Sequence, residues 1–343
     1  MSKPYKGLIC GTGSAGLYVG QVAEADGRAT VAGMSDPVSN QLAKGKERFP
    51  EAAIGTDYYE LLDRVEPNLV FVAGPDHLHA EQALSALDRG CHVLIEKPLA
   101  TTVEDAHRLV EAQQRTGLQV MADHTARYLY PYHEMVLAAR AGEIGQVFFT
   151  QGDYLHDMWA HYSPQGDRHT PWRIDSDNPQ NILLGGGCHA LDTMLWAINS
   201  PVEEVYGYSN KMSAPDFPAD DCYILVLRFT NGVLGKIFVA SGCSGDDWEK
   251  GGCGHIALYG TEGTLYQGML SRRGEESQRL EEPAIDAAVG GHGWGRSVVD
   301  FLDAVEGKID NPIPARVGAN VVSVCAAAFE ANRTGKPQQP HWF

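Results

Sequence analysis

The feature that most constrains the fold is the alternation of short apolar runs with helical patterns along the first 125 residues. The apolar runs have the length of strands and span residues 7–10, 30–34, 69–73, 91–95 and 118–122. Strands that alternate with helices pair in parallel, because each helix returns the chain to the same edge of the sheet. The sequence therefore predicts an α/β fold with a doubly wound parallel sheet over residues 1–124.

The pattern changes near residue 125, where strand-like segments become longer. These segments span residues 147–155, 202–210, 222–229, 233–240 and 255–259. Asn231-Gly232 separates two of them, and this dipeptide is typical of a tight turn between antiparallel strands. Residues 125–343 are therefore expected to form an α+β domain with a large open, mainly antiparallel sheet and late helices at 294–306 and 319–333.

Charge and composition exclude several classes of protein. The net charge of −17, from 27 basic and 44 acidic residues, opposes a nucleic-acid surface or an anionic-membrane surface. No apolar run approaches the roughly 20 residues that span a bilayer, and no signal-peptide pattern precedes the first strand. We therefore expect a cytoplasmic protein whose seven cysteines are reduced. The spacing of Cys243, Cys253 and His255 fits no usual zinc site, so no metal is expected.

The motif GTGSAG follows the first apolar run and opens a helix. Gly11 permits a tight turn, Gly13 lets the backbone approach a pyrophosphate, and Gly16 lets the helix pack closely on the strand. The first helical residues, Ser14 and Ala15, offer backbone N–H groups to the same phosphates. In this context the turn indicates a dinucleotide-binding site.

Asp36 lies 20 residues after the last glycine of this turn, at the end of the second apolar run. An acid at this spacing accepts hydrogen bonds from the hydroxyls of the adenosine ribose, and it would repel a 2′-phosphate. NAD is therefore the expected cofactor and NADP is less favoured. Lys44 and Lys46 are near enough in the sequence to leave NADP open as the alternative.

The fourth apolar run ends in Glu96-Lys97-Pro98, and an apolar strand has no packing reason to end in this charged pair. At the carboxyl end of a parallel strand, such residues face the ligand crevice. Glu96 and Lys97 are therefore expected beside the cofactor, as are Pro75 and His79 in the loop after the preceding run. His79 fits a structural role at a helix start equally well. We also expect a cis peptide bond between Lys97 and Pro98, since prolyl bonds tolerate this form at modest cost.

Four motifs follow one another along the chain: GTGSAG, GPDHLH at 74–79, GCHVLIEKP at 90–98 and GGGCHALDTMLW at 185–196. Together they resemble the Gfo/Idh/MocA oxidoreductases, which include glucose–fructose oxidoreductase and inositol dehydrogenase. The resemblance implies an NAD-binding Rossmann domain and a second domain whose open sheet often serves oligomer contact. We therefore expect a homodimer or homotetramer formed through that sheet, with a small polyol or sugar as substrate.

Matched residue by residue, the resemblance implies that Lys97 is a catalytic, substrate-binding lysine and that His189 accepts or donates the proton. The other candidate substrate-binding residues are Arg127, Tyr154, His156, Trp172, Arg173 and Asp192. Many members of the family carry an aspartate four residues before this histidine, but that position is Gly185 here. Either Lys97 and His189 suffice, or an acid from the polar stretch at 156–181 replaces it. The candidates for this replacement are Asp157, Asp175 and Asp177.

Oxidation of a secondary alcohol removes a hydride from carbon and a proton from oxygen. Histidine suits the proton transfer because its ordinary pKa is near neutral, and a lysine can polarise the oxygen. The sequence therefore predicts an NAD-dependent dehydrogenase that acts on a sugar, inositol or glycoside, or that reduces the matching ketone. The first alternative is a redox-neutral enzyme that retains NAD, oxidises a sugar transiently and eliminates a substituent. The second is a non-catalytic NAD-binding regulator.

Overall fold

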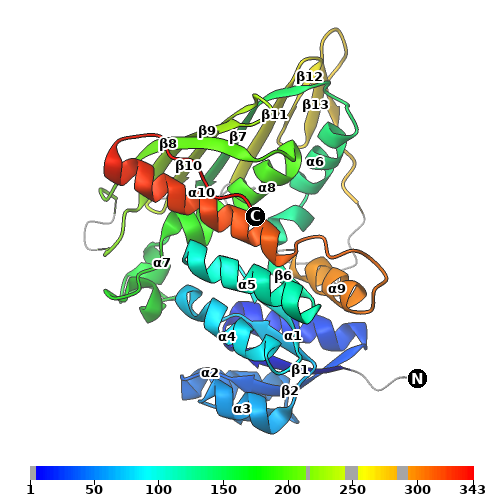
Figure 1. The fold of residues 1–343 in the computed structure, drawn as a ribbon, viewed down its shortest axis with the longest axis vertical. Coiled ribbons are helices and arrows are strands. Elements are labelled where there is room, and N and C mark those ends of the chain that lie inside the picture. Colours follow the sequence, from blue (N-terminus) through cyan, green and yellow to red (C-terminus); the bar gives the residue numbers. More distant parts are fainter. Residues whose placement is uncertain (1–4, 214–216, 244–253, 284–292) are drawn as a thin grey trace. The chain divides into compact units, whose positions relative to one another are not determined.

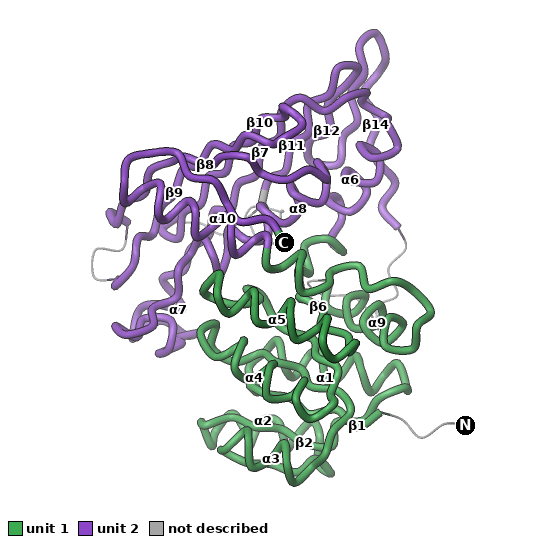
Figure 2. Tube along the Cα trace, in the orientation of Figure 1, with its two compact units in different colours: residues 1–128, 285–319, 343 green, residues 129–284, 320–342 purple. Residues whose placement is uncertain are grey.

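The computed structural model describes residues 5–213, 217–243, 254–283 and 293–343. The chain forms two compact units, which Figure 2 shows in different colours. Unit 1 comprises residues 1–128, 285–319 and 343, and unit 2 comprises residues 129–284 and 320–342. Residues 293–319 thus cluster with the N-terminal unit, whereas the sequence pattern assigns them to the C-terminal domain.

Unit 1 is built on a six-stranded sheet in the order β3-β2-β1-β4-β5-β6, in which every neighbouring pair is parallel. Its strands are β1 (Tyr5–Cys10), β2 (Ala29–Ser35), β3 (Ala53–Gly55), β4 (Leu69–Val72), β5 (His92–Glu96) and β6 (Val120–Asp123). Its helices are α1 (Ser14–Asp26), α2 (Ser39–Arg48), α3 (Tyr58–Val65), η1 (Asp76–Leu78), α4 (His79–Leu87), α5 (Val103–Thr116), η2 (Thr125–Tyr128) and α9 (Trp294–Val305). The strand order reverses between β1 and β4, which confirms the predicted doubly wound sheet. In such sheets the carboxyl ends of the strands border the ligand crevice.

The strands of unit 1 are buried on both faces, as a parallel sheet covered by helices requires. Phe71 of β4 is 1% exposed and meets Phe301 of α9 edge to face, with 6.3 Å between the ring centroids. Val298, Phe301 and Leu302 are all 0% exposed. Residues three and four apart lie on one side of a helix, so these three form a continuous apolar face. This face explains why α9 packs with the N-terminal sheet, beside α1 (Figure 1).

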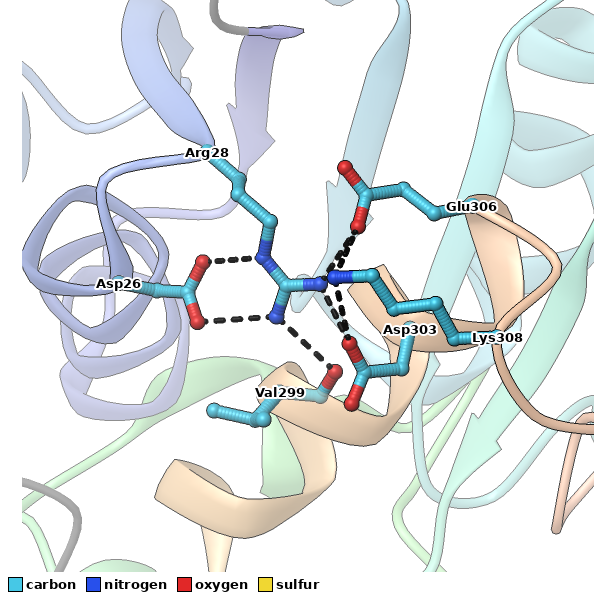
Figure 3. A network of polar contacts seen from close by, with 6 residues as sticks. All are labelled: Asp26, Arg28, Val299, Asp303, Glu306 and Lys308. Carbon is cyan, nitrogen blue, oxygen red and sulfur yellow. Dashed lines mark hydrogen bonds and ion pairs between the residues drawn. The ribbon is translucent and has the colours of Figure 1, made fainter.

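Arg28 ties the end of α9 to the loop between α1 and β2 (Figure 3). Its guanidinium donates hydrogen bonds to Asp26 at 2.5 and 2.9 Å, to Asp303 at 2.6 Å and to Glu306 at 2.9 Å. Lys308 pairs with the last two of these acids as well. The hydrogen bond to Asp26 contributes most to raising the pKa of Arg28. Two cations and three carboxylates thus form one network that holds the helix.

Unit 2 contains an eight-stranded sheet in the order β14-β13-β12-β11-β7-β10-β9-β8. Its strands are β7 (Val147–Leu155), β8 (Val202–Asn210), β9 (Cys222–Phe229), β10 (Leu234–Ala240), β11 (Gly254–Gly260), β12 (Gly263–Tyr266), β13 (Met269–Arg272) and β14 (Gln278–Arg279). Among these neighbours β7 and β10 pair in parallel, and the other pairs are antiparallel. The expected large, mainly antiparallel sheet is therefore confirmed. The hairpin at Asn231-Gly232 is confirmed too, with a φ of 88° at Gly232.

Helices cover one face of this sheet, with α8 packed against β7 and β11 (Figure 1). The helices of unit 2 are α6 (Tyr132–Arg140), α7 (Trp159–Tyr162), η3 (Pro171–Ile174), η4 (Leu183–Gly187), α8 (Cys188–Ile198) and the greater part of α10 (Ala315–Thr334). Side chains alternate along β9, where Leu225 and Leu227 are buried while Ile224 and Val226 are exposed. One face of the sheet therefore packs on helices, and the other presents apolar side chains.

Replacement of Arg28 by alanine should lower the thermal unfolding midpoint by several degrees. Three carboxylates would then face one another with Lys308 as their remaining cation, and we expect a loss of about 1–3 kcal/mol from this partly buried network. Arg333→Ala is the matched control, because it removes an exposed pair with Glu330 within one helix and should change the midpoint little. Equal midpoints for the two variants in differential scanning calorimetry would contradict this role of Arg28.

Candidate active site

The glycine turn between β1 and α1 has the geometry of a phosphate cradle. Gly11 has a φ of 95°, and a Cβ atom there would lie 2.6 Å from the backbone of Ala73. A Cβ atom on Gly16 would lie 2.1 Å from the carbonyl oxygen of Gly11, so both positions require glycine. A Cβ atom on Gly13, in contrast, would meet nothing within 4 Å. The space beside Gly13 and the start of α1 at Ser14 therefore fits the phosphates of a dinucleotide.

Asp36 follows the last residue of β2 and lies directly against this turn. Its Oδ2 accepts hydrogen bonds from the amide of Thr12, at 2.9 Å, and from Oγ1 of Thr12, at 3.0 Å. Its Oδ1 accepts a hydrogen bond from the amide of Val38, at 2.9 Å. These bonds hold the carboxylate, which is 9% exposed, in one orientation at the edge of the glycine turn.

The carboxyl end of β5 is held by hydrogen bonds from two elements. Glu96 accepts one from Nε1 of Trp294 in α9, at 2.8 Å, and one from the amide of Lys97, at 3.0 Å. The peptide bond between Lys97 and Pro98 is cis, which confirms the prediction made for it. The hydrogen bond from its amide to Glu96 holds the backbone of Lys97 at the end of β5.

His79 is 0% exposed and joins two loops at this edge of the sheet. Its Nδ1 lies 2.8 Å from the carbonyl oxygen of Pro98, and its Nε2 lies 3.0 Å from that of Gly74. Both ring nitrogens therefore contact backbone oxygens, so His79 braces the loops and keeps no ring nitrogen for a ligand. Pro75 occupies the N-cap position of η1 in the loop that His79 holds.

Asp123 is a further acid at this edge, and the sequence pattern does not reveal it. It is the last residue of β6 and pairs in register with Glu96 of β5. The side chain is buried, and its Oδ1 accepts a hydrogen bond from Oγ of Ser297. Burial and then the charge of Glu96 raise the pKa of Asp123 well above its ordinary value. A position at the end of a strand could have indicated Asp123, but the apolar run in the sequence stops one residue earlier, at Ala122.

In unit 2 the first turn of α8 carries His189, and a row of aromatic rings extends from it. The ring of Tyr154, in β7, stacks on His189 with 6.0 Å between centroids and an interplanar angle of 26°. His156 lies 5.8 Å from Tyr154, and His161 lies 6.5 Å from His156, again between centroids. Gly186 makes room for this row, since a Cβ atom there would lie 2.4 Å from Cε1 of Tyr154. The fold thus brings three candidate residues of the substrate site together.

Gln180 fills the space beside Gly185, the position at which many members of the resembling family carry aspartate. A Cβ atom on Gly185 would lie 2.7 Å from Nε2 of Gln180. Oε1 of Gln180 accepts a hydrogen bond from the guanidinium of Arg173, which lies 4.7 Å from the ring centroid of Trp172. A neutral amide bound to an arginine therefore occupies the space that an acid would need.

Arg173 also acts on a neighbouring histidine. Burial and then the charge of Arg173 lower the pKa of His161 to about 4.

The three acids considered as replacements take part in turns of the polar stretch. Asp157 accepts a hydrogen bond from the amide of Trp159, at 2.9 Å. Asp175 accepts one from the amide of Asp177, at 2.8 Å, and both of these residues are exposed. The side chain packed against Gly185 comes instead from Gln180, which no sequence pattern singles out.

The remaining two candidates, Arg127 and Asp192, are buried. Asp192 on α8 is 0% exposed, and Arg127 in η2 is 7% exposed. Arg127 donates a hydrogen bond to the carbonyl oxygen of Pro312, at 3.3 Å. The candidate cofactor residues, Lys97 and Arg127 thus belong to unit 1, and the candidates from Tyr154 to Asp192 belong to unit 2.

The described residues also bear on metal binding, thiol state and membrane crossing. No group of three or more His, Cys, Asp or Glu side chains in these ranges is arranged to hold a metal ion. The six cysteines in them are free thiols, and Cys253 lies outside the described residues. In the same ranges, no helix combines the length and the apolar character needed to cross a membrane.

Comparison with known proteins matches both parts of the chain. Residues 5–124 match the family model described as an oxidoreductase family with an NAD-binding Rossmann fold. Residues 132–266 match the model of the GFO/IDH/MocA C-terminal domain.

Curated relatives and solved structures match over most of the chain. Inositol 2-dehydrogenase 2 of Saccharopolyspora erythraea is 31% identical over 254 residues, which cover 71% of this chain and 70% of that protein. The 1-carboxy-3-chloro-3,4-dihydroxycyclohexa-1,5-diene dehydrogenase of Comamonas testosteroni is 26% identical over 67% of this chain, but the match spans just 56% of that relative. The crystal structure of scyllo-inositol dehydrogenase from Lactobacillus casei, with NAD(H) and scyllo-inositol, has a TM-score of 0.80 at 16% identity, over 98% of this chain and 99% of that one. The chain therefore belongs to the Gfo/Idh/MocA family of oxidoreductases, and its residues 5–124 form the NAD-binding Rossmann fold of that family.

Proposed function

We propose that the protein is an NAD-dependent dehydrogenase that oxidises a secondary hydroxyl of a sugar, inositol or glycoside, or reduces the matching ketone. The observation that carries this proposal is the edge of the unit 1 sheet. There the open glycine turn, the fixed Asp36 and Lys97 follow the carboxyl ends of β1, β2 and β5. The relative named inositol 2-dehydrogenase and the solved structure with NAD(H) and scyllo-inositol support the substrate class.

The residues at this edge fit NAD better than NADP. The phosphates would meet Gly13 and the amides that begin α1, where the helix dipole favours negative charge. Asp36 would accept hydrogen bonds from the ribose hydroxyls and would repel a 2′-phosphate. When bound there, the nicotinamide supplies the hydride acceptor. Glu96 and His79 contribute by fixing the loops on either side of Lys97.

His189 is proposed to take the proton from the hydroxyl oxygen as the hydride leaves the carbon that bears this hydroxyl group. An imidazole suits this step because its ordinary pKa is near neutral. The stacked ring of Tyr154 restricts rotation of His189 and so keeps its ring oriented. Lys97 is proposed to hydrogen-bond the same oxygen and to stabilise the negative charge that develops on it.

The remaining candidates of the site are proposed to bind the substrate. They are Arg127, His156, Trp172, Arg173 and Asp192. Trp172 offers an apolar ring for one face of a sugar, and Arg173 holds the Gln180 amide beside Gly185. Because that amide is neutral, it would stabilise a protonated His189 less than the aspartate of other family members does.

Lys97→Ala and His189→Ala should each reduce turnover of the substrate by at least about a hundredfold, since each removes a group that acts in the transition state. NAD affinity in titration calorimetry should change by less than about threefold, because neither residue is assigned to the phosphates or the adenosine. Lys336→Ala and His107→Ala are matched controls at exposed positions. Full activity in either of the first two variants would contradict the role of that residue.

We also propose that copies of the chain meet through the outer face of the unit 2 sheet, in a homodimer or homotetramer. Ile224 and Val226 of β9 are 46% and 53% exposed, and Tyr208 of β8 and Leu234 of β10 are 65% and 52% exposed. Ile224 pairs in register with Tyr208, so these side chains lie side by side. A large exposed apolar patch marks an interaction surface, and a second copy can cover it symmetrically.

Val226→Lys should convert this oligomer into monomers, because the new charge would lose its hydration in the interface without gaining a partner. Leu137→Lys changes a residue of α6 that is 49% exposed, and this matched control should keep the mass of the wild type. Light scattering coupled to size-exclusion chromatography measures the masses. A monomeric wild type, or an unchanged mass for Val226→Lys, would refute the proposed interface.

A further inference from the structure

Asp123 is a buried carboxyl group that the proposed mechanism does not use. It is 1% exposed and ends β6, and Glu96 ends the neighbouring strand β5. The two residues pair in register in the parallel sheet. Side chains of paired residues on adjacent strands point to the same face of a sheet, so the two carboxyl groups lie next to each other.

One face of α9 supplies a hydrogen-bond donor to each of these carboxyl groups. Trp294 and Ser297 are three residues apart and therefore lie on the same side of the helix. Nε1 of Trp294 donates to Glu96, and Oγ of Ser297 donates to Asp123. The Arg28 network holds the other end of this helix (Figure 3).

The two carboxyl groups differ in how well their negative charge is stabilised. Both oxygens of Glu96 accept hydrogen bonds from N–H groups, those of Trp294 and of the Lys97 backbone. Asp123 accepts a hydrogen bond from one hydroxyl, and within the described part of the chain its Oδ2 has no hydrogen-bond partner. A carboxylate with more donors keeps its charge, and a buried one with fewer keeps its proton. The geometry therefore favours a proton on Asp123.

The groups around Asp123 act on its pKa in both directions, and the raising effects are the larger ones. They are Glu96 on β5, Lys97 after it, and Tyr128 in η2, with Ser297 facing from α9. Burial and then Glu96 raise the pKa of Asp123 well above its ordinary value, while Ser297 and Lys97 act in the opposite direction. Ionisation of Asp123 would place a second negative charge beside Glu96 in a buried position, so Asp123 holds its proton.

We propose that Glu96 and Asp123 hold one proton between them, carried by Asp123, and so leave a single negative charge beside Lys97. Asp123 is then a positioning residue for Lys97. Two ionised carboxylates would attract the Lys97 ammonium to the strand ends, and so compete with the substrate oxygen for it, more strongly than one carboxylate already bound by Trp294. The shared proton is inferred from residues of unit 1 alone. Its effect on Lys97 rests on the function proposed above.

Infrared spectroscopy of the cofactor-free protein tests the shared proton. At neutral pH the wild type should show the carbonyl stretch of a protonated carboxylic acid, and Asp123→Asn should lose it. Asp63→Asn is the matched control, because it removes an exposed acid that pairs with Arg89, and it should keep the band. A wild-type spectrum without this band would overturn the proposal.

A measurement on the unmutated protein covers the case in which Asp123→Asn does not fold. With carbon-13 in the aspartate carboxyl groups, one NMR resonance should titrate at much higher pH than the others. If all aspartate resonances titrate in the usual acidic range, the proposal is wrong.

The same proton makes the stability of the protein depend on pH. The folded state binds this proton more tightly than the unfolded state, so the free energy of unfolding falls as pH rises through the raised pKa.

The pH dependence of turnover tests the effect on Lys97. Asparagine is uncharged like protonated aspartic acid, so Asp123→Asn should keep turnover within about threefold of the wild type at neutral pH. In alkaline solution the wild type should lose turnover as Asp123 ionises, and Asp123→Asn should not. Superimposable pH profiles would overturn the positioning role. Full activity of Lys97→Ala would instead refute the proposed function. The infrared band would still show whether the shared proton is present.

Discussion

The parallel pairing of six strands is the constraint on which the cofactor half of the site depends. Parallel strands end at one edge of their sheet, so residues that are distant in the sequence arrive there together. The glycine turn follows β1, Asp36 follows β2, and Glu96 and Asp123 end β5 and β6. Each acid is then oriented by hydrogen-bond donors, as Asp36 is by Thr12 and Val38. The topology of the sheet therefore brings the residues of the binding edge together, and hydrogen bonds then orient their side chains.

The helix α9 completes this edge from a distant part of the sequence. Phe301 packs it on the core beside Phe71, and Arg28 holds its end through a network of acids. Trp294 and Ser297 at its start reach the carboxyl groups that precede or adjoin Lys97. A helix of this length gains most of its stability from such tertiary packing. Loosening α9 would therefore change the charge environment of Lys97 as well as the stability of unit 1.

The sequence predicts the features that arise from local pattern. The strands at 147–155, 202–210 and 222–229 have the predicted bounds. The glycine turn is recognisable because its residues are contiguous. The short strands β3, β12, β13 and β14 escape prediction, since they offer few residues to show a pattern. Features created by tertiary neighbours escape as well. Gln180 matters because it packs beside Gly185, and Asp123 matters because Ser297 and Glu96 surround it, 174 and 27 residues away along the chain.

Transfer of deuterium from substrate to cofactor would decide whether the protein passes a hydride from a carbinol carbon of a sugar or cyclitol to NAD. The protein would be incubated with NAD and with inositols, aldoses and glycosides that carry deuterium on their carbinol carbons. For the true substrate, deuterated NADH should accumulate in step with the ketone. Product that keeps its deuterium while no NADH accumulates would exclude a net dehydrogenase, because the hydride would then return to the sugar in a redox-neutral reaction.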